Sequence, residues 1–361
     1  MWDLAVREDD YKGIDAMLAR YRGRPALSFR LIPALARADS SSIRTLLEEA
    51  RSQENRQLQI TARYTASYLE DFPTADSLAR LDLAWRERAP NRVNAQILIA
   101  GLAAAQGRWN DAREAFRLAE TMEGAVPVGV YRAMAAMAPM LPVPPADFRA
   151  MREDIDRWGP TMRIEGTGLA GQLQPHLRLF LLGLVDSRLG DSVGVERAAR
   201  ELEALARPSG SDGVVGGLAA TLRADLAWSR GRPGQAMDLL GSTGGPIPLD
   251  LVAVPRPVHF RIFSLEHARL LRALALAELG RDADALAWLR YGFRGSPQEF
   301  LYLGPIHRRM GEVFERLNQP DSAVVHYRKF LQIWKAADSG AAAELGDARN
   351  RLSRLTAQPH P

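Results

Sequence analysis

The chain has 361 residues, a net charge of +4 from 47 basic and 43 acidic side chains, and no cysteine. Its hydrophobic and charged shares, 47% and 25%, are typical of a folded globular protein. The lack of cysteine excludes disulfides, thiolate zinc sites and cysteine nucleophiles. The charges are interspersed without a Lys/Arg run, so we expect no specific nucleic-acid binding.

No stretch of about 18 apolar residues occurs, so we also expect no membrane span. The first residues lack the basic-then-apolar pattern of a signal peptide. These features favour a cytoplasmic protein, with the periplasm as the alternative.

The first part of the chain predicts irregular helical hairpins. Residues 3–21 contain the pattern of a turn followed by a helix. Residues 26–50 predict a hairpin, which Pro33 makes irregular. We expect the next hairpin to turn near Pro73, with Ala66 before the turn and Leu78 after it.

From about residue 100 onward, one pattern recurs five times: an Ala/Leu-rich run, a turn residue, and a second run with a small or β-branched residue five positions later. Glycine and asparagine accept the left-handed conformation that ends a helix. A new helix begins within about three residues, which predicts an antiparallel helical hairpin at each turn. The expected turn residues are Gly107, Gly190, Gly231, Gly280 and Asn318.

These units resemble the tetratricopeptide repeat (TPR), a helical hairpin of about 34 residues. That family has a small residue seven positions before the turn and alanine five positions after it. Around Gly280 these positions hold Ala273 and Ala285, and around Asn318 they hold Gly311 and Ala323. The resemblance implies an all-α fold, a TPR-like α-solenoid of antiparallel helical hairpins that forms a right-handed superhelix.

The regularity of the pattern divides the chain into four parts. Pro and Gly are concentrated in a central stretch, where two short helices fit at about 128–138 and 145–158. The expected parts are TPR-like hairpins at 1–120, an irregular connector at 121–175, TPR-like hairpins at 176–336, and a capping helix with a tail at 337–361.

One motif suggests different chemistry. Gly166, Gly168 and Gly171 have the GxGxxG spacing of a dinucleotide-binding loop, so a cofactor-dependent enzyme is the alternative to a repeat protein. That loop requires a buried strand before it and a helix immediately after it. The preceding segment is short and charged, and Pro175 would interrupt the following helix. We therefore interpret this stretch as a loop that leads into a repeat helix.

The sequence offers no catalytic, cofactor-binding or metal-binding residues beyond that motif. None of the six histidines is paired at i, i+4, and neither HExxH nor GxSxG occurs. Acidic residues are spread along helices rather than paired. We therefore expect a protein that is not an enzyme, with no cofactor, metal or small-molecule substrate.

Stacked hairpins form an extended groove that is lined by the first helix of each repeat. The family pattern places six candidate partner-binding residues in this groove: Arg63, Asn94, Arg188, Asp225, Trp228 and Arg309. The resemblance thus implies a scaffold that binds a protein or peptide partner. The last repeat, near residues 311–338, also resembles the TPR tails of bacterial Ser/Thr kinases and transcriptional regulators, which implies the sensing or docking part of a signalling protein.

Overall fold

The computed structural model describes residues 10–52, 57–86, 89–122, 128–158, 174–205, 212–241, 266–291 and 299–357. In these ranges the regular elements are α-helices and two short 3-10 helices, and no strand occurs. The elements are α2 (Tyr11–Arg20), α3 (Leu27–Ala36), α4 (Ser40–Ser52), α5 (Gln57–Tyr68), α6 (Phe72–Trp85), α7 (Ala89–Ala105), α8 (Trp109–Glu120), α9 (Val128–Ala136), α10 (Pro145–Arg157), α12 (Gln174–Arg188), α13 (Ser192–Leu205), α14 (Asp212–Ser229), α15 (Pro233–Gly241), α18 (Glu266–Glu278), α19 (Asp282–Tyr291), η1 (Glu299–Tyr302), α20 (Leu303–Arg316), α21 (Pro320–Ile333), η2 (Ser339–Ala341) and α22 (Ala342–Ala357).

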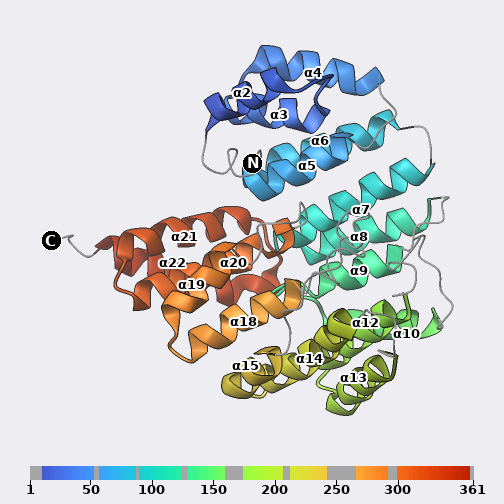
Figure 1. The fold of residues 1–361 in the computed structure, drawn as a ribbon, viewed down its shortest axis with the longest axis vertical. Coiled ribbons are helices and arrows are strands. Elements are labelled where there is room, and N and C mark those ends of the chain that lie inside the picture. Colours follow the sequence, from blue (N-terminus) through green and yellow to red (C-terminus); the bar gives the residue numbers. More distant parts are fainter. Residues whose placement is uncertain are drawn as a thin grey trace.

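Consecutive helices pair as hairpins, and the hairpins stack side by side (Figure 1). All five expected turn residues have a positive φ, from 54° at Asn318 to 76° at Gly190. The left-handed turn and the short connection therefore form as the sequence predicts. The protein is an all-α solenoid of antiparallel helical hairpins. The pairs built on these turns are α7–α8, α12–α13, α14–α15, α18–α19 and α20–α21.

Small residues at the repeat positions let helices approach closely, both within a hairpin and between neighbouring hairpins. A Cβ atom at Gly311 would lie 2.7 Å from Cε1 of Tyr327, and one at Gly183 would lie 2.5 Å from Cδ1 of Leu222. Ala112 and Ala285, five positions after their turns, are fully buried. Interiors this dense leave no room for a larger side chain without displacement.

The hairpin of α5 and α6 forms, but its turn is not at Pro73. The chain turns at Glu70, which has a φ of 55°, and Pro73 lies in the first turn of α6. Proline fits there because the N–H groups of a first helical turn have no helical partner. The hairpin expected in residues 26–50 consists of α3 and α4, and Pro33 lies inside α3.

The central stretch contains helices α9 and α10, close to the two short helices expected there. The loop between them includes Met140 at a φ of 63°. Pro142 of this loop packs against the C-terminal part of the chain, because a Cβ atom at Gly340 would lie 2.7 Å from Cβ of Pro142. The GxGxxG motif at 166–171 lies outside the described residues, and Pro175 occupies the first turn of α12.

The array closes on itself. Figure 1 shows helices α18–α22 turning back towards α5–α8, and η1 contacts both α5 and α7. The indole Nε1 of Trp334 donates a hydrogen bond to the carbonyl of Ala105 at 3.0 Å. The N–H of Asp338 donates to the carbonyl of Gly107 at 3.0 Å. The carboxylate of Asp338 accepts a bond from the N–H of Asn110 at 2.8 Å, which caps the start of α8 from the far end of the chain.

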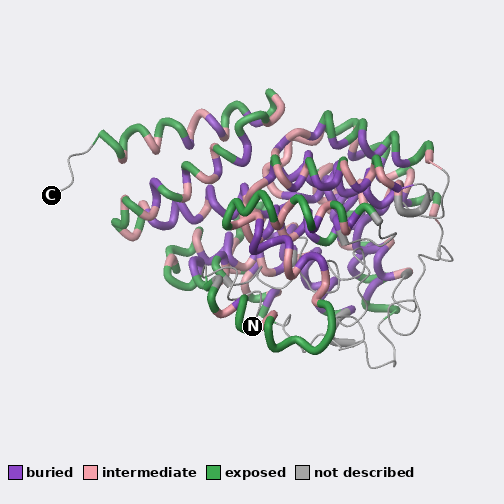
Figure 2. Tube along the Cα trace, turned by 90° about the horizontal axis from the view of Figure 1, so that it is seen from above, coloured by how far each residue is buried: buried purple, intermediate pink, exposed green. Residues whose placement is uncertain are grey.

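This contact, which we call the closing seam, is apolar at its centre and charged at one edge. Phe300 and Trp334 are almost completely buried in it, and burial of each ring contributes roughly 2–3 kcal/mol. At the edge, Glu70 lies 2.8 Å from Nζ of Lys329 and 3.1 Å from Nε2 of His307. Buried segments run through the interior while α22 exposes much of one face (Figure 2). One continuous hydrophobic core joins the two sides of the seam.

Candidate functional site

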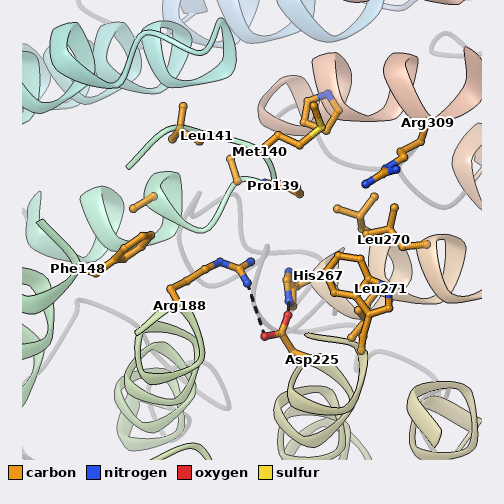
Figure 3. A pocket seen from close by; sticks show the side chains of 15 residues that line it. Pro139, Met140, Leu141, Phe148, Arg188, Asp225, His267, Leu270, Leu271 and Arg309 are labelled. Carbon is orange, nitrogen blue, oxygen red and sulfur yellow. Dashed lines mark hydrogen bonds and ion pairs between the residues drawn. The ribbon is translucent and has the colours of Figure 1, made fainter. Parts of the chain in front are cut away.

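A pocket of about 280 Å³ lies on the inner side of the array, where the first helices of successive hairpins converge (Figure 3). Helices α12, α14, α18 and α20 form one part of its wall, and the α9–α10 loop with α10 forms the rest. We call it the Arg188–Arg309 pocket. Its lining residues are Ala136, Ala138, Pro139, Met140, Leu141, Phe148, Arg188, Asp225, Trp228, His267, Leu270, Leu271, Leu274, Pro305 and Arg309.

The structure brings together four of the six groove residues expected from the sequence. Arg188 ends α12, Asp225 and Trp228 lie on α14, and Arg309 lies on α20. The repeat pattern located these side chains because equivalent helices face the same side of a solenoid.

The other two expected groove residues lie elsewhere. Arg63 on α5 and Asn94 on α7 are each only 8% exposed. Segment η1 contacts both of these helices, so the chain's own closing seam covers the inner side there. In this closed arrangement neither side chain is presented to a partner.

Asp225 is the centre of the polar wall and is 1% exposed. Its carboxylate accepts a short hydrogen bond from the hydroxyl of Ser187 and lies 2.7 Å from Nε2 of His267. Arg188 lies 3.7 Å away as a looser ion pair. Burial by itself raises the pKa of Asp225, but Arg188, His267 and Ser187 outweigh burial and hold that pKa well below its usual range. Asp225 is therefore ionised, and His267 donates from Nε2.

The order of these groups does not create a nucleophile. In a serine-based catalytic site the histidine contacts the serine and removes its proton. Here Asp225 lies between the two, because it accepts from both Ser187 and His267. The cluster therefore fixes the positions of side chains instead of activating the hydroxyl.

His267 also presents an unused polar atom. Its Nδ1 is buried and has no hydrogen-bond partner among the described residues, although the ring lines the pocket. Sequence reasoning did not identify His267 as a site residue. It pairs with Asp225 across 42 positions, and no repeat offset relates the two. Only the three-dimensional packing of α14 against α18 reveals the pair.

The remaining lining combines cations with an apolar wall. Arg309 donates to Glu312 at 2.7 Å, and Glu312 is held independently by Arg308. Trp228 donates from Nε1 to Glu278 at 3.0 Å, which fixes its ring beside the pocket. Leucines from α18, Phe148 from α10 and the α9–α10 loop supply apolar surface. A pocket of this composition suits a ligand with an anionic group and an apolar part.

In the ranges that the structure describes, no group of three or more potential metal ligands is found. In the same ranges, no helix is both long and apolar enough to cross a bilayer.

Fold and site together define a helical-repeat solenoid with a cationic pocket on its inner side. No family model matches the chain, and no curated protein matches it. Among solved structures, a tetratricopeptide repeat protein from Parabacteroides merdae ATCC 43184 is similar at 13% identity. The similarity covers 82% of this chain and 97% of that one, with a TM-score of 0.39. The fold assignment rests on the chain's own hairpins.

Proposed function

We propose that the chain is a non-catalytic interaction scaffold that binds an acidic segment of a protein partner at the Arg188–Arg309 pocket. One observation carries this proposal: residues from four of the described inner helices converge on one cationic pocket. Repeat proteins act by presenting surface, and function must be argued from the site. Arginine and tryptophan are also the residue types that most often dominate binding energy at protein interfaces.

The charges of the pocket favour a carboxylate. Asp225 already has Ser187, His267 and Arg188 around it, so it does not need a cation from a ligand. Glu312 keeps Arg308 if Arg309 turns to a ligand. Both pocket arginines can thus accept an anion without leaving a buried carboxylate unpaired, and guanidinium groups bind carboxylates in a bidentate manner.

The closing seam limits the partner segment to a short one. An extended peptide cannot follow the inner side along α5 and α7, because η1 contacts those helices. We therefore propose Arg188, Trp228 and Arg309 as the contact residues and leave Arg63 and Asn94 out of the interface.

We further propose that the scaffold is the docking part of a bacterial signalling or regulatory protein. This proposal rests on the resemblance of the last repeat to the TPR tails of such proteins. Crosslinking to partners in cell lysate, followed by mass spectrometry, identifies whether kinases, regulators or other proteins are captured.

The test of partner binding is selection of random peptides by phage display on the purified chain. We expect enriched peptides to carry Asp or Glu next to an apolar residue. Arg309→Met should weaken these peptides about tenfold, because a hydrogen bond to a charged group contributes about 1.5 kcal/mol or more. Arg349→Met on the exposed surface of α22 is the matched control and should bind normally.

Peptides that bind Arg309→Met as tightly as the unmodified chain would contradict the proposed site. Crosslinks confined to α13, α19 or other outer helices would contradict it as well.

A further inference from the structure

We infer that the Arg188–Arg309 pocket also binds a small free organic acid, a carboxylate on a compact apolar body, and that this acid competes with the partner's acidic segment. The competition rests on the proposed function, whereas binding of the acid does not. The sequence alone led us to expect no small-molecule substrate. This acid is a ligand that the protein holds without converting it.

The first argument is enclosure. A solenoid groove is normally an open channel, but here the wall comes from α10, α12, α14, α18, α20 and the α9–α10 loop. Figure 3 shows side chains pointing into the same space from opposite sides. The volume of about 280 Å³ is just below the roughly 300–1,000 Å³ of pockets that hold drug-sized molecules. The pocket therefore fits a ligand smaller than a drug and smaller than a peptide of several residues.

The second argument is the set of unused polar groups. Nδ1 of His267 is buried without a described partner, and the His267 residue is only 9% exposed. A buried polar atom of this kind costs free energy until a ligand or water satisfies it. Arg188 faces the same space, held only by the 3.7 Å ion pair among described contacts. An anionic head group between Arg188 and Arg309 would pair with both guanidinium groups, and a water bound beside it would donate to Nδ1 of His267.

The third argument is the apolar surface next to this head-group position. Leu270, Leu271 and Leu274 follow one another on α18, and Phe148 faces them from α10. A phosphate or a sugar would leave these side chains in contact with polar atoms. A hydrocarbon without charge would instead leave the two arginines unpaired in a partly closed space. Only a ligand with both parts matches the whole lining.

The experiment is calorimetric titration of the full chain with three probes: 4-phenylbutyrate, its neutral amide 4-phenylbutyramide, and acetate. We expect 4-phenylbutyrate to bind with a dissociation constant on the order of 0.1–1 mM, as is usual for about a dozen non-hydrogen atoms. The amide lacks the charge and acetate lacks the body, so each should bind about tenfold more weakly or worse.

Variants locate the binding. Arg309→Met should weaken 4-phenylbutyrate about tenfold, Arg309→Lys should restore part of the loss, and Arg349→Met should leave it unchanged. Thermal melting of each variant confirms folding. Three results would overturn the inference. The three probes bind equally, 4-phenylbutyrate does not bind at about 10 mM, or Arg309→Met keeps full affinity.

Competition separates this inference from the proposed function. If 4-phenylbutyrate binds in an Arg309-dependent manner while no acidic peptide is selected, the ligand site stands and the partner proposal fails. If Arg309-dependent peptides are selected but 4-phenylbutyrate neither binds nor displaces them, the ligand site fails and the partner proposal stands.

Discussion

Replacement of Gly311 by alanine tests the close contact between α20 and α21. A Cβ atom at this position would lie 2.7 Å from Cε1 and 2.9 Å from Cδ1 of Tyr327. Carbon atoms in contact are about 3.5 Å apart, so the ring would have to move by about 0.8 Å. Tyr327 is fully buried, and its hydroxyl donates to Glu315 at 2.5 Å, so the ring cannot move without loss of this bond.

Two opposing terms set the magnitude. Overpacking of a dense core costs about 1–3 kcal/mol. Alanine is favoured over glycine inside a helix by about 1 kcal/mol. Gly311→Ala should therefore lower the free energy of unfolding by up to about 2 kcal/mol. Gly346 on α22 is the matched control, because a Cβ atom there meets nothing within 4 Å. Gly346→Ala should raise the free energy of unfolding by about 1 kcal/mol, because only the helix preference of alanine acts there.

The difference between these variants isolates the clash, since the helix term cancels. Native-state hydrogen exchange is the appropriate assay, because solenoids open in local units; the α20 and α21 amides report on Gly311→Ala and the α22 amides on Gly346→Ala, each relative to the unmodified chain. A clash of 1–3 kcal/mol corresponds to about 5- to 150-fold faster exchange in Gly311→Ala than in Gly346→Ala. If both variants slow exchange equally, Tyr327 does not pack on Gly311 and the reasoning is wrong.

Four further predictions address the seam and the alternative function. Trp334→Phe leaves the buried carbonyl of Ala105 without its donor, so the amides of α7 and α8 should exchange faster by the equivalent of about 1–3 kcal/mol. Burial and the nearby His307 and Lys329 lower the pKa of His326 to about 3. The free energy of unfolding should therefore fall as the pH decreases from about 6.5 towards 3. His326→Phe should flatten this part of the pH profile. Burial raises the pKa of Glu70, but His307 and Lys329 outweigh burial and lower this pKa to about 2. Stability should therefore fall further as the pH decreases below about 4.5. Titration with NAD(H) and ATP should show no micromolar binding, and binding that Gly168→Ala abolishes would support the cofactor alternative instead.

The sequence predicts the hairpins well because their determinants are local. A turn at Gly107 or Gly280 needs a residue that accepts positive φ, and the small residues needed for close packing lie at fixed offsets from it. The turn at Glu70 is not predictable in this way, because it lacks such a local signal. Glutamate rarely adopts a φ of 55°. Its ion-pair partner Lys329 lies 259 positions further along the chain, so no local pattern marks this turn.

The pocket is only partly predictable. Arg188, Trp228 and Arg309 share the inner side of the repeat, which the periodic pattern specifies. The pairing of Asp225 with His267 and the contribution of the α9–α10 loop depend on how separate hairpins meet. Local sequence patterns do not encode such contacts. The hydrogen bond from Trp334 to Ala105, which joins residues 229 positions apart, is another example.

Closure of the array is what changes the kind of ligand that the inner side can hold. In an open solenoid, Arg63 and Arg309 would belong to one long channel suited to an extended chain. Phe300 and Trp334 bury their rings in the closing seam, so the inner side of α5 and α7 is covered. Arg188 and Arg309 line one small pocket with apolar walls. Electrostatic attraction is stronger there than on an open surface, because less water surrounds the charges. The proposed affinity for a single carboxylate group, free or attached to a partner, rests on that geometry.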